Sequence, residues 1–143
     1  MPGYEDSTTI DAPIDTVWSV LIDVERMPEW TPSMRSVHLL QGPALRRGSR
    51  VRIKQPRLVA STWTVDLFDP PRDFSWHSRV GSVQTTASHL LEDHGRTTLA
   101  TFSIRHTGLG ARVAALLVGR LTRRYINFEL HGLKARAEQA ASR

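Results

Sequence analysis

The side chains best suited to acid–base chemistry in this sequence are those of His89 and Tyr125. An unperturbed histidine has a pKa of about 6.5, which suits it to proton transfer near neutral pH, and a tyrosine hydroxyl can donate a hydrogen bond to an enolate. Gln55 adds an amide that can bind a carbonyl oxygen. Each has a structural alternative: a satisfied core histidine, a tyrosine packed edge-on against a sheet, and a glutamine that ties down the strand end before Pro56.

Other kinds of site lack the residues they require. The chain has no cysteine, which excludes disulfides, thiolate metal sites and a cysteine nucleophile. The histidines show no metal-ligand spacing; they stand at positions 38, 77, 89, 94, 106 and 131. Asp66, Asp69 and Asp73 are predicted on an outward face or in a turn, and Glu129 on a part of the last helix that points away. We therefore expect no metal and no organic cofactor.

The candidate residues are expected on an antiparallel meander of strands. Short breaks such as "DPPR" and "EDHGR" separate the strands, which favours antiparallel neighbours. The predicted strands span residues 4–10, 36–40, 49–55, 59–68, 73–80, 84–92 and 97–105.

Side-chain alternation assigns one face of each strand to the interior. The bulky inward set comprises Val51, Ile53, Trp63, Val65, Leu67, Phe74 and Trp76. In the following strand, His89 shares the inward side with Val83, Thr85, Ala87 and Leu91, and it is the only histidine predicted to face inward. The last strand is ambiguous, because Phe102 and Leu99 favour opposite parities; a bulge near Ala100 would reconcile them.

Helical periodicity appears at both ends of the chain. The segment "DAPIDTVWSVLIDV" places Pro13 in a first turn and is followed by a buried stripe at Ile14, Val17, Trp18 and Leu21. Pro28 and Pro32 allow only a short or broken helix around Trp30. The last helix, from about residue 108 to 141, has two apolar seams: Leu116, Gly119, Arg123, Ile126, Leu130, Leu133 and Ala137, and beside it Leu117, Leu121, Tyr125 and Phe128.

An apolar inner face with a few polar groups is typical of a small-molecule site. The candidate ligand-binding residues are Trp30, Gln55, Trp63, Phe74, Trp76, Ser78, Thr85, Phe102 and Phe128. The alternative for each tryptophan is that it fills the core beneath the last helix.

The sequence resembles the START-like (SRPBCC) superfamily in its polyketide cyclase/dehydrase and lipid-transport branch. The resemblance is carried by "IDAPIDTVWSVLIDVERMPEW", "GSRVRIKQP", "WTVDLFDPPRDFSWHS" and "LHGLKARAE". It implies one α+β domain over residues 1–143 with the helix-grip fold: a curved antiparallel sheet of six or seven strands around a long C-terminal helix, with two short helices after the first strand. It also implies an internal cavity for a hydrophobic ligand.

For function, the resemblance leaves two hypotheses open. One is a polyketide cyclase or dehydratase that needs no cofactor, with His89 or Tyr125 moving protons. The other is a non-catalytic carrier or sensor of lipids or other hydrophobic molecules, including sterols. A third hypothesis, a basic interaction module with a vestigial cavity, rests on charge alone.

The charge balance is basic, with 19 Lys and Arg against 14 Asp and Glu. Arginines crowd residues 46–52 and 120–124, which we interpret as solvated faces because no nucleic-acid motif accompanies them. No secretory signal is visible, and "VAALLVG" is too short to span a membrane. We expect a cytoplasmic monomer or homodimer with a hydrophobic ligand, no nucleic-acid partner and no stable membrane insertion.

Overall fold

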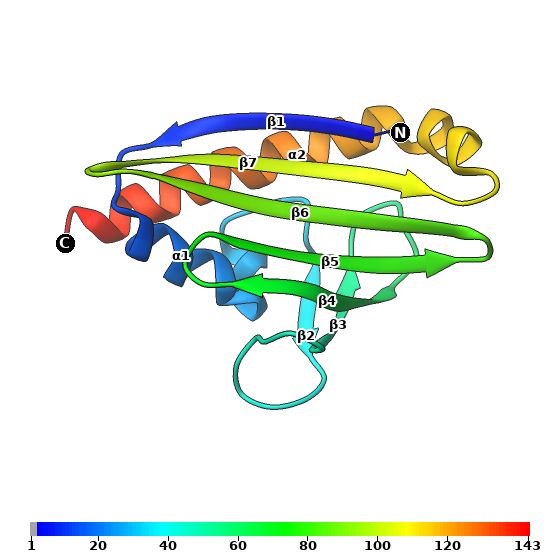
Figure 1. Ribbon diagram of the computed structural model, residues 1–143, viewed down its shortest axis with the longest axis horizontal. Coiled ribbons are helices and arrows are strands. Elements are labelled where there is room, and N and C mark those ends of the chain that lie inside the picture. Colours follow the sequence, from blue (N-terminus) through cyan, green and yellow to red (C-terminus); the bar gives the residue numbers. More distant parts are fainter. Residues whose placement is uncertain (1–2) are drawn as a thin grey trace.

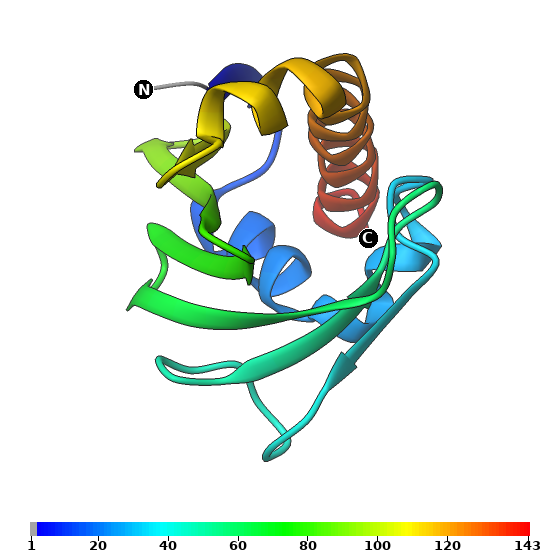
Figure 2. The same cartoon turned by 90° about the vertical axis from the view of Figure 1, so that its right-hand side faces the viewer.

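Seven antiparallel strands form one curved sheet that wraps around a long C-terminal helix (Figures 1 and 2). The computed structural model describes residues 3–143. The strand order is β1-β7-β6-β5-β4-β3-β2. In chain order the elements are β1 (Gly3–Ile10), α1 (Ile14–Ile22), the 3-10 helix η1 (Val24–Glu29), β2 (Ser36–Leu39), β3 (Arg50–Lys54), β4 (Ser61–Asp69), β5 (Asp73–Val80), β6 (Val83–His94), β7 (Thr97–Thr107) and α2 (Ala111–Ala141). The predicted helix-grip fold is confirmed.

The two short helices follow the sequence signals. Pro13 precedes α1 in extended backbone, where its missing N–H costs no hydrogen bond. The predicted stripe of Ile14, Val17, Trp18 and Leu21 is buried. Pro28 lies inside η1, which ends one residue later. The expectation of a short second helix is therefore correct.

A bulge in β4 changes the predicted inward face. Val65 pairs with Trp76, but the next paired residue is Leu67, opposite Ser75, so Asp66 is the extra residue. Beyond the bulge the alternation is reversed. Leu67 points outward, contrary to the prediction, and Phe68 packs against Trp18 with ring centroids 5.5 Å apart.

The last strand needs no bulge. β6 and β7 pair without a break in register from Gln84↔Thr107 to His94↔Thr97. Thr98, Ala100 and Phe102 are buried on the same face, so the bulge predicted near Ala100 is wrong. Two alternating apolar sets occur because the outward Leu99 is itself half-buried.

The start of α2 is rotated relative to the predicted seams. Leu116 and Leu117 are 84% and 78% exposed. Ala114 and Val118 face the sheet instead, next to Leu121, which was predicted to be buried. Residues 113–118 are all apolar, so periodicity alone does not fix which side is buried. Among residues 3–143, no helix is long and apolar enough to cross a bilayer.

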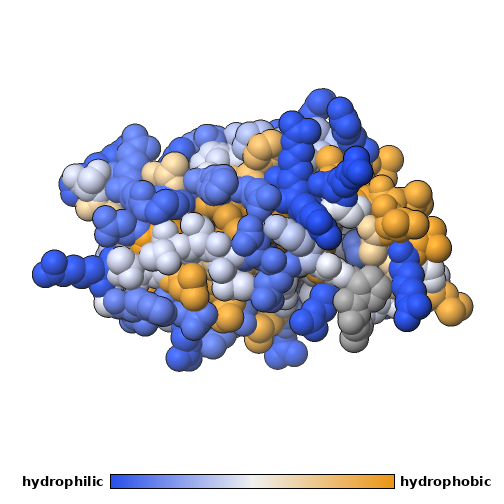
Figure 3. Space-filling model, turned by 90° about the horizontal axis from the view of Figure 1, so that it is seen from above, coloured by the Kyte–Doolittle hydropathy of each residue, from blue (hydrophilic) through white to orange (hydrophobic). Residues whose placement is uncertain are grey.

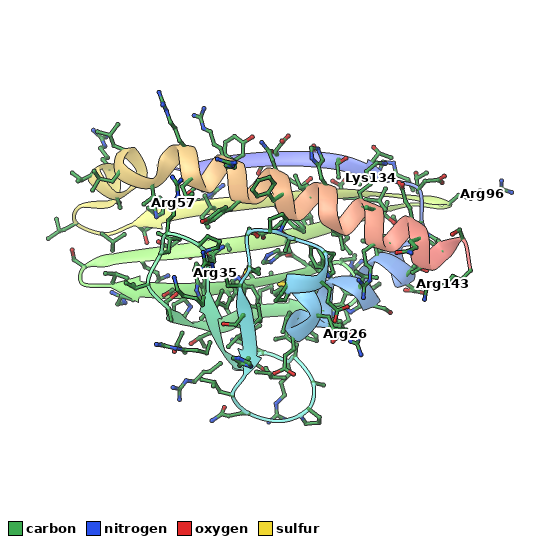
Figure 4. All side chains as sticks on the ribbon, turned by 180° about the vertical axis from the view of Figure 1, so that it is seen from behind. Arg26, Arg35, Arg57, Arg96, Lys134 and Arg143 are labelled. Atoms are coloured by element: carbon green, nitrogen blue, oxygen red, sulfur yellow. The ribbon has the colours of Figure 1, made fainter. Side chains whose placement is uncertain are left out.

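The C-terminal half of α2 is anchored by close contacts. At Gly132 the helix approaches Trp30 so closely that an added Cβ would overlap the Trp30 carbonyl oxygen. Lys134 Nζ donates to the Thr9 carbonyl at 2.7 Å, and Figure 4 shows Lys134 on the side of the helix nearest β1. Arg136 forms an ion pair of 2.7 Å with Glu29. These contacts fix the helix against β1 and η1.

We expect Gly132→Ala to lower the free energy of unfolding by about 1–3 kcal/mol, because the overlap outweighs the helix propensity gained with alanine. Gly119→Ala is the matched control in the same helix: a Cβ added there has no atom of the described residues within 4 Å, so we expect a gain of up to about 1 kcal/mol. Chemical denaturation measures both. Equal effects for the two variants would contradict the close approach at Gly132.

Candidate functional site

A cavity of about 320 Å³ lies between the concave face of the sheet and the N-terminal half of α2. Its volume falls in the range of small-molecule sites, roughly 300–1,000 Å³. Most of the lining is apolar and includes Ile53, Leu58, Trp63, Trp76, Ala87, Phe102, Ile104, Val118, Leu121 and Ile126. The polar side chains in the lining include Gln55, Ser78, Thr85, His89, His106, Tyr125 and Glu129.

Most of the predicted site residues meet at this cavity. Strand register explains why: Trp76 pairs with Ala87 on β6, and His89 pairs with Phe102 on β7, so inward positions of neighbouring strands lie side by side. The predicted residues in the lining are Gln55, Trp63, Trp76, Ser78, Thr85, His89, Phe102 and Tyr125.

Three predicted ligand-binding residues lie away from this lining. Trp30 packs against Gly132 at the anchored end of α2, and its buried Nε1 has no hydrogen-bond partner among residues 3–143. Phe74 is fully buried in the core and contacts Trp18 edge-on. Phe128 lies about 100° around the helix from Glu129, and the Arg124 guanidinium sits 5.5 Å from its ring centroid. For these three residues the structure favours packing roles.

His89 is held by three aromatic rings. Phe74 stacks on it at a centroid distance of 4.2 Å, while Phe102 and Trp76 meet it edge-on at 4.8 and 5.5 Å. Nδ1 lies 3.1 Å from the Phe74 carbonyl, and because a carbonyl only accepts, Nδ1 carries the proton. Burial lowers the pKa of His89 to about 4. The ring is therefore neutral at pH 7, and the lone pair of Nε2 is free to accept a proton or a hydrogen bond.

Glu129 also lines the cavity, contrary to the prediction that it points away. Its side chain is buried, and burial raises its pKa to about 7. Ser33 Oγ donates to its Oε2 at 3.0 Å, and Thr31 Oγ1 lies 2.8 Å from Ser33 Oγ. The sequence held a signal: Glu129 is four residues from both Tyr125 and Leu133, so helical spacing puts it on their buried face.

Tyr125 closes the cavity on the side of the β3–β4 connection. Its hydroxyl donates to the Pro56 carbonyl, and burial raises its pKa. Lys54 Nζ binds the carbonyls of Gln55 and Leu58, which holds the same turn. Figure 4 shows Arg57, also in this turn, alongside α2. The Tyr125 hydroxyl proton is therefore used in the hydrogen bond to the turn, and toward a ligand the hydroxyl oxygen can only accept.

A second histidine faces inward. His106 Nδ1 lies 2.9 Å from Thr85 Oγ1, and burial lowers its pKa. The prediction of His89 as the only inward histidine is wrong, because β7 continues to Thr107, beyond the predicted end at Arg105, and His106 takes the same face as Ala100 and Phe102. Within residues 3–143, no three histidine, aspartate or glutamate side chains are grouped to hold a metal ion.

Sheet, helix and cavity together define a START-like protein for hydrophobic ligands. The chain belongs to the family described as polyketide cyclase / dehydrase and lipid transport, whose model matches residues 1–138. The expected family membership is therefore confirmed. No curated protein sequence matches the chain.

Solved structures share the fold at low sequence identity. The ZhuI aromatase/cyclase from Streptomyces sp. R1128 is 21% identical with a TM-score of 0.72, covering 96% of this chain and 93% of its own. The di-domain ARO/CYC BexL from the BE-7585A biosynthetic pathway is 22% identical with a TM-score of 0.70, covering 94% and 46%. Ara h 8.0201 is 12% identical with a TM-score of 0.74, covering 94% and 96%. Identities this low establish the fold alone.

The opposite pKa shifts of His89 and Glu129 predict opposing effects of pH on stability. In the unfolded chain His89 is protonated below about pH 6.5, whereas in the folded protein it is protonated only below about pH 4. The contribution of His89 to the free energy of unfolding therefore rises with pH between these two values. Folded Glu129 keeps a proton up to about pH 7 that the unfolded chain loses near 4.5, so its contribution falls with pH. Between pH 4.5 and 6.5 the two largely cancel.

A variant that lacks one of these two groups should show the pH dependence that the other gives to the stability. Relative to wild type, Glu129→Gln should gain stability as pH rises from 4.5 to 7, and His89→Gln should lose it between pH 4 and 6.5, each by about 3 kcal/mol. Denaturant titrations at several pH values in this range measure the difference in the free energy of unfolding between variant and wild type. The contributions of all other titratable groups cancel in that difference. Parallel pH profiles for wild type and either variant would contradict the assigned burial.

Proposed function

We propose that the cavity binds a cyclic or polyketide-like hydrophobic molecule and that the protein promotes its cyclisation or dehydration. One observation carries the proposal: a single apolar cavity holds an uncharged imidazole and a carboxyl group that keeps its proton to near neutral pH. Pairs of groups whose pKa values are pushed apart in this way serve as acid and base in enzymes.

The residues suggest a division of roles. His89 Nε2 takes a proton from the carbon beside a ketone, and the Glu129 carboxyl gives its proton to the reacting oxygen. In an aldol cyclisation a carbon–carbon bond forms and that oxygen becomes a hydroxyl. In a dehydration the carbon–oxygen bond breaks, a double bond forms and water leaves. Proton return from the imidazolium to the carboxylate completes either cycle.

Tyr125 has a positioning role in this proposal. Its hydroxyl proton is donated to the Pro56 carbonyl, so it holds the turn that carries Gln55. Gln55 is then the polar group at the cavity wall able to orient a substrate carbonyl. Trp63 and Trp76, whose ring centroids are 6.3 Å apart, offer flat apolar surfaces to a ring system.

A carrier of hydrophobic molecules is the second candidate. The packing of His89 among three aromatic rings favours it, because a ring held for structural reasons has the same surroundings. A carrier shares the cavity and its binding specificity but not the proton transfers. Binding and turnover must therefore be measured separately.

Binding is tested by filling the cavity. Ala87→Phe places a ring in the lining and should lower the affinity for a sterol or a polycyclic quinone at least about tenfold. Quenching of tryptophan fluorescence measures that affinity. Thr86→Phe, on the neighbouring outward position of β6, is the control and should bind normally. If both variants bind as wild type does, this cavity is not the ligand site.

Turnover is tested with a cyclic β-hydroxyketone, whose dehydration gives a conjugated enone followed by ultraviolet absorbance. We expect His89→Gln and Glu129→Gln each to lower kcat by about 10²–10⁴, with the affinity for quinone nearly unchanged. His77→Gln is the control, since His77 faces outward and pairs with Asp66 at 2.7 Å. Quinone binding by wild type with no turnover of ketone substrates would support the carrier instead.

A further inference from the structure

Large apolar side chains are exposed together at one end of the molecule. Leu109, Val113, Leu116 and Leu117, from the start of α2 and the loop before it, are between 59% and 84% exposed, and Val80 at the β5–β6 turn is 72% exposed. We call these five residues the apolar tip. Figure 1 shows their elements meeting at the end of the sheet opposite α1, and Figure 3 shows hydrophobic surface gathered at that end. Exposed apolar clusters of this kind mark interaction sites.

The tip is continuous with the cavity. Val80 is both exposed and part of the cavity lining, as is Val59 in the β3–β4 connection. On α2, Ala114 and Val118 face the cavity, and each directly follows a residue of the tip, Val113 and Leu117, about 100° further around the helix. An apolar molecule that reaches the tip can therefore enter the cavity along apolar surface.

The charge around the tip is positive. Residues 97–128 contain no Asp or Glu, and their arginines are Arg105, Arg112, Arg120, Arg123 and Arg124. Arg112 and Arg120 flank the exposed leucines on α2, and Arg79 is next to Val80. Within residues 3–143, none of these three arginines forms an ion pair with a carboxylate.

We propose that the apolar tip docks on the surface of anionic lipid bilayers. Leucines that enter the interfacial region and arginines that contact lipid phosphates are the combination such surfaces select. Charge complementarity favours this partner over a second copy of the chain, because two tips face to face would bring Arg112 and Arg120 against the same residues of the other copy. Docking in this orientation turns the cavity opening toward the lipid.

Vesicle co-sedimentation tests the proposal. We expect wild type to bind vesicles of phosphatidylcholine mixed with phosphatidylglycerol, to bind pure phosphatidylcholine much more weakly, and to lose affinity as salt is raised. The double variant Leu116→Ser with Leu117→Ser should bind at least about tenfold more weakly. Replacing Arg112 and Arg120 with glutamine should cost about fivefold for each arginine on anionic vesicles.

Controls separate this surface from general stickiness and from the cavity. Leu40→Ser and Leu67→Ser remove leucines that are 47% and 45% exposed outside the tip, and both should leave vesicle binding unchanged. Ala87→Phe should also still dock, because its change lies inside the cavity. Thermal unfolding checks that each variant is folded.

Three results would overturn the proposal. They are absence of wild-type binding to anionic vesicles, unchanged binding by the double leucine variant, and equal loss of binding in the Leu40 and Leu67 controls. A dimer of wild type that becomes a monomer in the double leucine variant, without vesicle binding, would instead assign the tip to self-association.

Discussion

The close approach of α2 to Trp30 at Gly132 fixes the C-terminal half of the helix over the sheet, and the position of the cavity depends on it. A helix fixed at one end over a curved sheet cannot follow the sheet along its full length. At the anchored end, Leu130, Leu133 and Ala137 pack against the core formed with α1. Toward its N-terminus, α2 turns smaller side chains of its own toward the sheet, such as Ala114 and Thr122, and the space beneath it remains open as the cavity.

The cavity walls satisfy most of their polar groups within the protein. His89 donates to a backbone carbonyl, Tyr125 to another, and Glu129 accepts from Ser33. Leaving such groups unpaired in an apolar interior would cost roughly 1–3 kcal/mol each. The groups that remain available to a ligand include the lone pair of His89 Nε2, the Glu129 carboxyl proton and the Gln55 amide. The first two are complementary to a carbonyl compound with an acidic carbon–hydrogen bond.

The sequence predicts the fold well because its signals agree. Alternation in β5 and β6, a proline before α1 and short polar turns each specify one local structure, and Trp63, Trp76, His89 and Phe102 meet through strand register alone. The failures occur where a local pattern has two solutions. The bulge at Asp66 has no marker residue, and the apolar run at 113–118 fits any rotation of the helix.

Glu129 shows a different limit. A glutamate among apolar neighbours is ordinarily assigned to solvent, because burial of a charged carboxylate is costly. The stripe from Tyr125 to Leu133 places it inside nevertheless, and the cost is reduced by a raised pKa and by Ser33, which is 96 residues away in sequence. Partners that distant cannot be inferred from one sequence without the fold.

Because the His89 ring is uncharged above about pH 4 and the Glu129 carboxyl keeps its proton up to about pH 7, neither side chain carries a charge in mildly acidic conditions. An ionised ligand would lose its hydration shell in this cavity without gaining an oppositely charged partner. A fatty acid would have to take up a proton on entry, whereas a sterol or a ketone would enter unchanged. Selection by electrical neutrality thus adds to selection by shape.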